Sequence, residues 1–292
     1  MKKLADKIKH VGVIGNSEKA SCAAVVSRAA KLITASGRKV FSDSTTAKLA
    51  GFKTRIYPDA AALGQEVDLL LVFGGDGTIL RVAREIAGSR TPILGINIGA
   101  LGFLTAVPSS ELSQALKQVW QGEFKFEPRV LIQATGQCSG VPINHNALND
   151  LVIARGNASR LIELAVSVDG DPLTRYRCDG LIVSSPTGST AYSLAAGGAV
   201  VFPTAQVLAL TPICPHTLSN RALILSLAST IEVTISNPET ILSADGRVVC
   251  ELSTGDVITI RRSRRTVSLM QLAGSSFCET LRKKLHWRGA SV

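Results

Sequence analysis

The hydrophobic pattern of the first third of the chain alternates between two periods. The runs at 10–16, 68–73 and 93–97 are almost continuously apolar over the length of a strand. Such runs are typical of parallel strands that are covered on both faces. Another short strand is expected at 39–43. Together these runs predict an α/β N-terminal domain, with a parallel sheet flanked by helices.

Helical spacing fills the gaps between the predicted strands. A helix is expected after Ser17, a candidate N-cap residue, and Gly37 is placed where a glycine commonly ends a helix. Its buried face would comprise Cys22, Val26, Ala29 and Ile33. Further helices are predicted at about 78–87 and at 110–120.

The second half of the chain changes to a period of two. Apolar and polar residues alternate at 231–236 and 266–269, and further strand candidates lie at 162–170, 179–185 and 256–262. The second domain is therefore expected to be β-rich. Four arginines at 261–265 fall between two of these patterns, which predicts a hairpin turn there. From about Ser276, Phe277, Leu281 and Leu285 share one helical face.

Composition places the chain among globular proteins. Its 292 residues are 46% hydrophobic and 18% charged, which favours about two domains. Apolar runs fall short of the ~20 residues of a membrane helix, and Asp6, Lys7 and Lys9 interrupt any signal-peptide core. We therefore expect a cytoplasmic protein whose six cysteines are reduced thiols.

A net charge of +10 raises the question of an anionic partner. Aromatic residues make up only 4% of the chain and are not interleaved with the basic runs. That argues against a stacking surface for single strands. The bland interpretation of the basic runs is a solvated surface, so neither nucleic acid nor a membrane is expected as a partner.

The sharpest chemical motif is the Gly74-Gly75-Asp76-Gly77-Thr78 segment. It directly follows an apolar strand and precedes a helix, where glycines and free N–H groups suit a phosphate. It is neither a Walker A loop nor GxGxxG. Asp76 could simply cap the helix. A carboxylate in a phosphate loop also suits a general base that accepts a proton from an attacking hydroxyl.

Two further segments are polar within apolar surroundings. Asn149 and Asp150 could form an Asx turn that opens a strand, or could hydrogen-bond sugar hydroxyls or an amide. The segment from Cys178 to Gly198 runs from a strand into a Pro-Thr-Gly turn and small hydroxyl residues. Such residues suit close packing of a flat ligand, although a solvated loop has the same composition.

Taken in order, these segments resemble the bacterial NAD kinases: GGDGT with the following LR and AR, GINIGALGFLT, ALND, DGLIVSSPTGSTAYSLAAGG and ICPHTLSNRAL. The resemblance runs from about residue 10 to residue 287. The DGLIVSSPTGSTAYSLAAGG stretch is its specific part, because GGDG alone also occurs in diacylglycerol-kinase-like and phosphofructokinase enzymes.

The resemblance implies ATP-dependent phosphorylation of the adenosine ribose 2′-hydroxyl of NAD, with Mg²⁺ or another divalent cation, in a homo-oligomer (dimer or tetramer). No dedicated metal site is visible, which fits a cation that arrives on the triphosphate. The implied domains are an α/β domain at 1–104, a β-rich NAD-binding domain at 105–274, and a last helix at 275–292 that returns to the first domain.

Carried over by position, the resemblance makes Asp76 the general base, and the loop would bind phosphate through Gly74, Gly75, Gly77 and Thr78. Phe103 would pack against adenine, Asp179 would hold the nicotinamide end with Arg177 close by, and residues 190–195 would line the adenosine. The implied NAD contacts are Asp76, Gly77, Phe103, Asn149, Asp150, Arg160, Arg177, Asp179, Thr190, Ala191, Tyr192, Ser193, Leu194, Ala195 and Arg247. Many relatives have Glu at the position of Asp150, and similar enzymes often have Gln at that of Arg247.

Two other functions fit parts of the sequence. A GGDG-type lipid or sugar kinase would use the same loop but leaves the 179–195 stretch without a role. A non-catalytic dinucleotide sensor would need no base, so Asp76 argues against it.

Overall fold

The computed structural model describes residues 2–53, 55–105, 107–156, 160–216, 221–237 and 239–287. The ICPHTLSNRAL motif at 213–223 thus lies partly outside the described residues. The chain forms two compact units, Met1–Pro128 with Val267–Val292, and Arg129–Thr266. These bounds differ from the expected 104/105 and 274/275, because helix α6 (Leu112–Gln121) packs in the first unit and Leu269 pairs with one of its strands.

The first unit is built on a parallel sheet, as the apolar runs predict. Its strand order is β3-β2-β1-β4-β5, and each neighbouring pair is parallel. Both β6 and the end of β18 pair with β5. The bounds are β1 (His10–Gly15), β2 (Lys39–Asp43), β3 (Arg55–Tyr57), β4 (Leu69–Gly74), β5 (Ile93–Asn97), β6 (Val107–Pro108) and β18 (Val257–Leu272).

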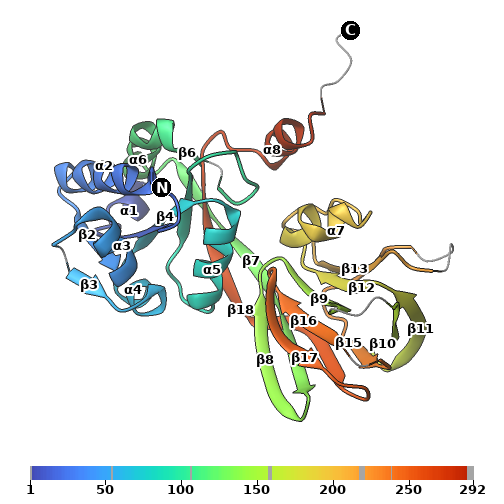
Figure 1. Ribbon diagram of the computed structural model, residues 1–292. Helices are drawn as coiled ribbons and strands as arrows, with labels where there is room; N and C mark the ends of the chain where they lie inside the picture. Colours follow the sequence, from blue (N-terminus) through green and yellow to red (C-terminus); the bar gives the residue numbers. More distant parts are fainter. Residues whose placement is uncertain are drawn as a thin grey trace, which may run out of the picture. The chain divides into compact units, whose positions relative to one another are not determined.

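Helices cover both faces of this sheet (Figure 1). On one face lie α1 (Lys2–Ala5), α2 (Cys22–Ala35) and α6, whose apolar sides form one core with the inner residues of β1, β4 and β5. On the other lie α4 (Ala60–Glu66) and α5 (Asp76–Glu85). The expected face of α2 is buried, but the helix begins at Cys22 with Ser21 as its N-cap residue, not after Ser17.

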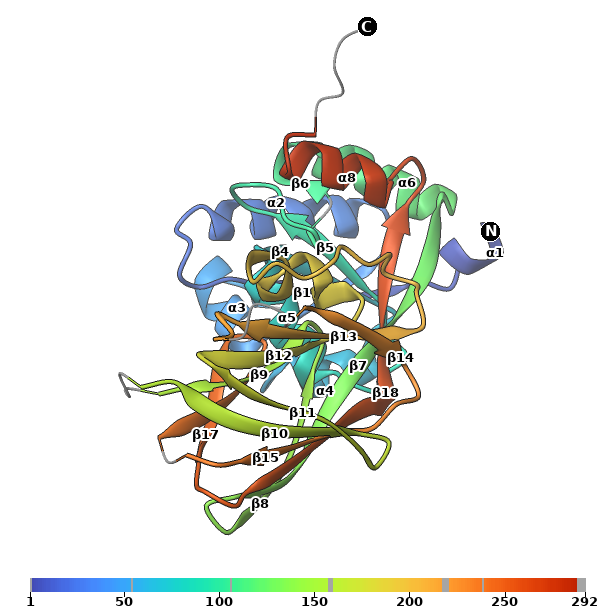
Figure 2. The ribbon, with the colours of Figure 1, turned by 90° about the vertical axis from the view of Figure 1, so that its right-hand side faces the viewer.

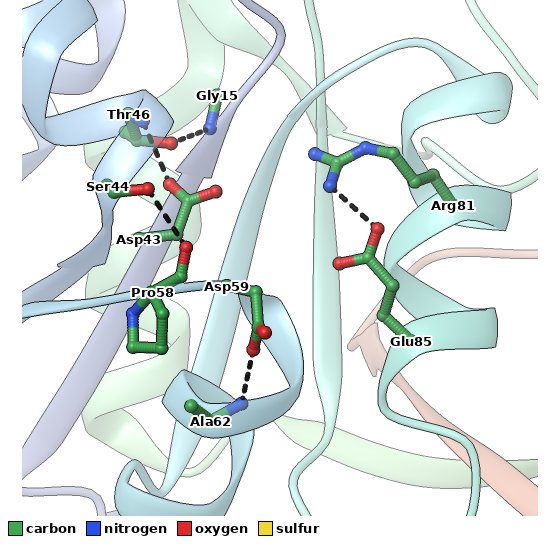
Figure 3. A network of polar contacts seen from close by, with 9 residues as sticks. All are labelled: Gly15, Asp43, Ser44, Thr46, Pro58, Asp59, Ala62, Arg81 and Glu85. Carbon is green, nitrogen blue, oxygen red and sulfur yellow. Dashed lines mark hydrogen bonds and ion pairs between the residues drawn. The ribbon is translucent and has the colours of Figure 1, made fainter.

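Two short helices, α3 (Ser44–Ala50) and α4, were not expected from the sequence. Each begins at an aspartate whose carboxylate accepts a backbone N–H: Asp43 from Thr46 at 2.9 Å, and Asp59 from Ala62 at 2.8 Å (Figure 3). The Thr46 hydroxyl in turn accepts the N–H of Gly15 at 2.8 Å. These caps satisfy donors that a short helix leaves free, and they fix α3 to the end of β1.

The last helix, α8 (Phe277–Lys284), also belongs to the first unit. It lies beside α6 (Figure 2), and residues of both helices line one groove. The Lys284 ammonium donates to the carbonyl of Leu101 at 2.7 Å. The 3₁₀ turn η1 (Ser109–Glu111) precedes α6. No described helix is long and apolar enough to cross a bilayer.

The second unit is β-rich, as expected, with two sheets whose inner residues share one core. One sheet has the order β11-β10-β15-β18 and adds β7, which pairs with β18 and β8; the other has the order β14-β13-β12-β9-β16-β17. The bounds are β7 (Phe124–Cys138), β8 (Val141–Ala147), β9 (Asp150–Arg155), β10 (Ile162–Val168), β11 (Asp171–Cys178), β12 (Gly180–Ser184), β13 (Val207–Ile213), β14 (Leu223–Ser226), β15 (Ile231–Ile235), β16 (Thr240–Ala244) and β17 (Arg247–Leu252). The helical pieces are η2 (Thr187–Thr190) and α7 (Tyr192–Ala195).

The prediction of a hairpin turn at 261–265 is wrong. The segment from Val257 to Leu272 is one continuous strand, β18, and its four arginines are exposed along it. Polar residues interrupt the alternation at 261–266 because side chains on both faces of the strand are exposed there. Five of these six side chains are exposed. A charged stretch within a strand therefore has the same pattern as a turn.

The expectation of six reduced cysteines is also corrected. Cys138 at the end of β7 and Cys250 on β17 form a disulfide with a Cα–Cα distance of 6.4 Å, within the usual range for such a bond. It joins strands from the two sheets of the second unit. The other four cysteines are free thiols, two buried and two exposed.

Candidate functional site

The GGDGT loop connects β4 to α5 in the first unit. Gly75 is the N-cap residue of α5, and Asp76 and Gly77 are its first two residues, whose N–H groups have no partner within a helix. A Cβ at Gly74 would lie 2.3 Å from the Thr78 hydroxyl, so Thr78 packs over a position that requires glycine. A Cβ at Gly77 would meet open space. The loop thus offers N–H groups at an open surface, while the Thr78 side chain is buried beneath it.

Asp76 does not cap its own helix; its carboxylate binds the loop after β5. Oδ2 accepts the N–H of Phe103 at 2.8 Å. Oδ1 accepts the N–H groups of Leu104 and Thr105 at 3.0 and 3.1 Å, and the Thr105 hydroxyl at 3.2 Å. Gly102 is needed beside it, because a Cβ there would lie 1.9 Å from Oδ1. The structure therefore brings together Asp76, Gly77 and Phe103, which sequence reasoning placed in one site.

Phe103 presents a half-buried ring next to this carboxylate. The Lys284 ammonium of α8 lies 5.8 Å from the ring centroid, within the range of a cation–π contact. A flat ligand could therefore pack only on the part of the Phe103 ring that Lys284 leaves open.

Two residues near the loop were missed by sequence reasoning. The ammonium of Lys19, in the segment between β1 and α2, donates to the Ile98 carbonyl and lies 4.0 Å from a Cβ built at Gly75. Asn97, at the end of β5, is buried and its Oδ1 has no hydrogen-bond partner among the described residues. Asn97 lies within the GINIGALGFLT segment but was given no role there, and Lys19 belongs to none of the quoted motifs; the fold brings both to the loop.

In the second unit, Asn149 and Asp150 meet the turn between β16 and β17. The Asp245 carboxylate accepts the N–H groups of Leu148, Asn149 and Asp150 at 3.0, 2.7 and 3.3 Å. The N–H of Asp245 donates back to the Asp150 carbonyl at 3.0 Å. Asp245 and Gly246 have φ of 48° and 75°, as a two-residue hairpin turn of Asp-Gly type requires. Sequence reasoning missed Asp245, although its Asp-Gly pair between two strand patterns was a visible turn signal.

The carboxyl of Asp150 is 4% exposed. Burial, and then the neighbouring charge of Asp245, raise the pKa of Asp150 from 3.8 to about 7. Beside it, the Asn149 Oδ1 is buried without a partner in the described part of the chain. This corner of the second unit therefore holds one unpartnered acceptor, the Asn149 Oδ1, beside a buried carboxyl whose pKa is raised.

The 185–188 turn packs directly on that corner. Ser185 donates its N–H to the Asn149 carbonyl at 2.9 Å. A Cβ at Gly188 would lie 2.1 Å from the same carbonyl oxygen, so only glycine fits. Sequence reasoning treated Asn149–Asp150 and the Pro-Thr-Gly turn as separate segments, and the structure brings them together.

The segment 190–195, which is predicted to line the adenosine, contains both buried and exposed side chains. The Ser193 hydroxyl is buried against Thr211 at 2.9 Å and supports the segment from within. Tyr192 is 47% exposed. Thr190, Ala191 and Leu194 are half-buried, and Ala195 is exposed.

Asp179 lies between β11 and β12 and pairs with Arg155, whose Nε is 3.2 Å from Oδ1. Arg155 was missed by sequence reasoning, which placed Arg177 beside Asp179. The side chains of Arg177, Arg160 and Arg247 are all exposed, and within the described residues Asp179 pairs with Arg155 and forms no ion pair with Arg177. Among the described residues, no cluster of three His, Cys, Asp or Glu side chains could hold a metal ion.

Comparison with known proteins gives one consistent picture. Residues 11–124 match the ATP-NAD kinase N-terminal domain, and residues 148–272 match the ATP-NAD kinase C-terminal domain. An NAD kinase of Syntrophotalea carbinolica is 41% identical over 86% of this chain and 89% of its own. An NAD kinase of Paraburkholderia phytofirmans is 40% identical over 97% of this chain and 95% of its own.

Two solved structures are similar over almost the whole chain. Yeast NADH kinase complexed with NADH has a TM-score of 0.87 at 27% identity, covering 98% of this chain and 89% of its own. An NAD kinase from Archaeoglobus fulgidus in complex with ATP has a TM-score of 0.73 at 28% identity, covering 96% and 100%.

Proposed function

The chain belongs to the ATP-NAD kinase family and is an NAD kinase, and we propose that Asp76 is the general base of its reaction. In that reaction the terminal phosphoryl group of ATP moves to the 2′-hydroxyl of the adenosine ribose of NAD, which gives NADP and ADP. The hydroxyl proton leaves as the new O–P bond forms and the bond to the ADP oxygen breaks.

The single observation that carries this role is the unequal use of the two oxygens of Asp76. Oδ1 accepts three hydrogen bonds and Oδ2 accepts only one. A carboxylate has about four acceptor positions on two oxygens, so Oδ2 keeps the capacity to accept the substrate hydroxyl. The bonds to 103–105 fix the carboxylate in place, so that the hydroxyl meets a preorganised acceptor.

The phosphate-binding role stays with the loop backbone at Gly74, Gly75, Gly77 and Thr78. The free N–H groups and the dipole at the start of α5 favour negative charge. The buried Thr78 hydroxyl supports the loop through Gly74 and does not itself face the phosphate.

We assign dinucleotide contacts in the second unit to Asn149, Asp150, Asp179 and 190–195, and, less centrally, to the exposed Arg160, Arg177 and Arg247. The unpartnered Oδ1 of Asn149 supports this assignment, because a buried acceptor without a donor costs free energy until a ligand supplies one. A ligand group that has both a hydrogen-bond donor and an acceptor, such as an amide or a ribose, could hydrogen-bond to Asn149 and to Asp150, whose carboxyl has a raised pKa.

A divalent cation such as Mg²⁺ would enter with ATP. The described residues offer no cluster of metal-binding side chains, which fits a cation held mainly by phosphate oxygens and water. Bound there, it neutralises charge on the transferring phosphoryl group. Within the GGDGT loop itself, Asp76 is the one carboxylate.

Two further properties are proposed with the function. A homo-oligomer is supported by Val141 and Val248, 64% and 63% exposed on the edge strands β8 and β17, since such apolar edges favour pairing. A cytoplasmic location is also proposed; the four free thiols fit a reducing compartment, whereas the Cys138–Cys250 disulfide does not.

The decisive experiment measures NADP formation from NAD, ATP and Mg²⁺ by the purified protein. NAD lacking the 2′-hydroxyl is the matched control acceptor and should give no product. Phosphorylation of a lipid or a free sugar in preference to NAD would contradict the proposal, and so would tight NAD binding with no turnover.

A further inference from the structure

The segment between β1 and α2 contains a basic residue that no part of the assigned function uses. It is fixed in place by backbone bonds: the N–H of Asn16 donates to the Phe73 carbonyl at 2.9 Å, and the N–H of Lys19 donates to the Asn16 carbonyl at 3.3 Å. Phe73 directly precedes the GGDGT loop. The position of Lys19 is therefore tied to the end of β4 and does not depend on a free surface loop.

The ammonium of Lys19 lies between two glycine segments. It donates to the Ile98 carbonyl, lies 4.0 Å from a Cβ built at Gly75 and 3.4 Å from one built at Gly99. Apart from the two flanking residues of each glycine, no other atom lies within 4 Å of either Cβ position. Gly99 has a φ of 114°, which excludes other residues. The backbone at Gly75 and at Gly99 thus carries no side chain, and the Lys19 ammonium lies close to both.

This cation has no carboxylate partner. Among the described residues, Lys19 forms no ion pair, although it is half-buried. A partly desolvated ammonium held by one carbonyl keeps two N–H donors and most of its charge for an anion. The carboxylate of Asp76 hydrogen-bonds to the 103–105 segment, and within the described residues it forms no ion pair with Lys19.

A second, independent observation points to a ligand at this position. The side chain of Asn97 donates Nδ2–H to the Gly99 carbonyl at 2.9 Å, and its buried Oδ1 has no partner in the described part of the chain. Asn97 and Lys19 therefore meet at Gly99, one with a free acceptor and the other with free donors. A phosphate with its bound water or a ligand hydroxyl satisfies both.

We propose that Lys19 binds the triphosphate of ATP at the mouth of the GGDGT loop, next to the N–H groups of α5. The proposal rests on the proposed function, since it assumes that this loop receives the phosphoryl donor. The donor is favoured over NAD because a triphosphate carries more negative charge than the pyrophosphate of NAD, and a positive potential favours the more highly charged ligand.

The test measures binding of Mg–ATP, in the absence of NAD, by titration calorimetry with the full-length protein. Lys19→Gln should weaken Mg–ATP binding by about 10- to 100-fold, the range for a hydrogen bond to a charged group. Lys19→Arg should recover most of that loss, because it restores the charge. Lys48→Gln, which removes an exposed lysine of α3, is the matched control and should leave binding unchanged.

Steady-state kinetics then identify the nucleotide. Lys19→Gln should raise the KM for ATP and leave that for NAD within threefold. Mg–ATP affinity within twofold of wild type in Lys19→Gln overturns the proposal, as does an effect confined to the KM for NAD. Absence of NADP formation by the wild-type protein would instead contradict the proposed function itself.

Discussion

The Asp76 carboxylate accepts the backbone N–H of Phe103 at 2.8 Å. Asp76, which we propose as the general base, is thus joined by a direct hydrogen bond to Phe103, which the resemblance places against adenine. Because of this bond, a substitution at Asp76 changes both the base and the position of the ring.

Asp76→Asn should lower kcat by about 10²- to 10⁴-fold, the usual range for loss of a general base. The amide also turns an NH₂ toward one of the N–H donors of 103–105, so a modest rise in the KM for NAD is expected. Thr105→Val is the control, because it removes one hydrogen bond to Oδ1 and keeps the base. If both variants lose turnover equally, Asp76 acts only by holding the loop.

Asp179→Ala should raise the KM for NAD by about 10-fold or more and leave that for ATP nearly unchanged. A ligand polar group that loses its partner in a closed site costs about 1–3 kcal/mol. Glu163→Gln is the control: this residue pairs with Arg175 at 3.5 Å in the same unit and has no proposed ligand role. Equal effects of Asp179→Ala on both substrates would contradict a contact specific to NAD.

Asp245→Asn should raise the KM for NAD by about 5- to 30-fold, since an amide cannot accept all three N–H groups that hold Asn149 and Asp150. Asp169→Asn is a close control. Asp169 also precedes a glycine in a hairpin turn, and its carboxylate accepts the N–H of Thr230 at 2.7 Å. Similar kinetic losses in both variants would mean that the effect is a general loss of stability.

Asp150 should make the free energy of unfolding depend on pH. Its pKa is raised to about 7 in the folded protein, so the folded state binds more protons than the unfolded chain between about pH 4 and pH 7. Stability conferred by the neutral carboxyl is present below that window and is lost as pH rises through it. Asp150→Asn should remove this fall, as measured by urea unfolding at pH 5 and pH 8; an unchanged difference between the two pH values would contradict the prediction.

The Cys138–Cys250 disulfide should stabilise the second unit. It closes a loop with a sequence separation of 112 residues, and cross-links of this kind typically contribute about 2–4 kcal/mol. Replacing both cysteines by serine, or adding a thiol reductant, should therefore lower the unfolding temperature. Cys278→Ser, which changes an exposed free thiol, should not. A reductant that leaves the wild-type unfolding temperature unchanged would show that the disulfide adds no stability.

Much of the fold could be predicted from the sequence because its strands are strongly patterned. Leu69–Gly74 and Ile93–Asn97 are fully buried, so their continuous apolar runs had one interpretation. The short helices α3 and α4 were missed because seven residues give too few apolar positions to establish a period. Their signals were the capping aspartates Asp43 and Asp59, which also occur in ordinary turns.

The candidate site divides in the same way. Asp76 could be located because it directly follows an apolar strand, and Asn149–Asp150 because they lie among apolar residues. Lys19, Arg155 and Asp245 could not, because each reaches its partner across a long separation in the sequence, and such pairs are set by the sheet order alone. Arg155 meets Asp179 because β9 and β12 are antiparallel neighbours. A periodicity argument does not contain that information.

The hydrogen bonds between Asp76 and the segment that begins at Phe103 fix the distance between the carboxylate and the backbone that carries the ring. Four hydrogen bonds join the segment 103–105 to the carboxylate that we propose as the base. With the proposed roles of Asp76 and Phe103, an acceptor would have to present a flat group and a hydroxyl at matching separation before its proton could be taken. Molecules that carry a reactive hydroxyl at another separation would then be excluded by their length, without any contact that repels them.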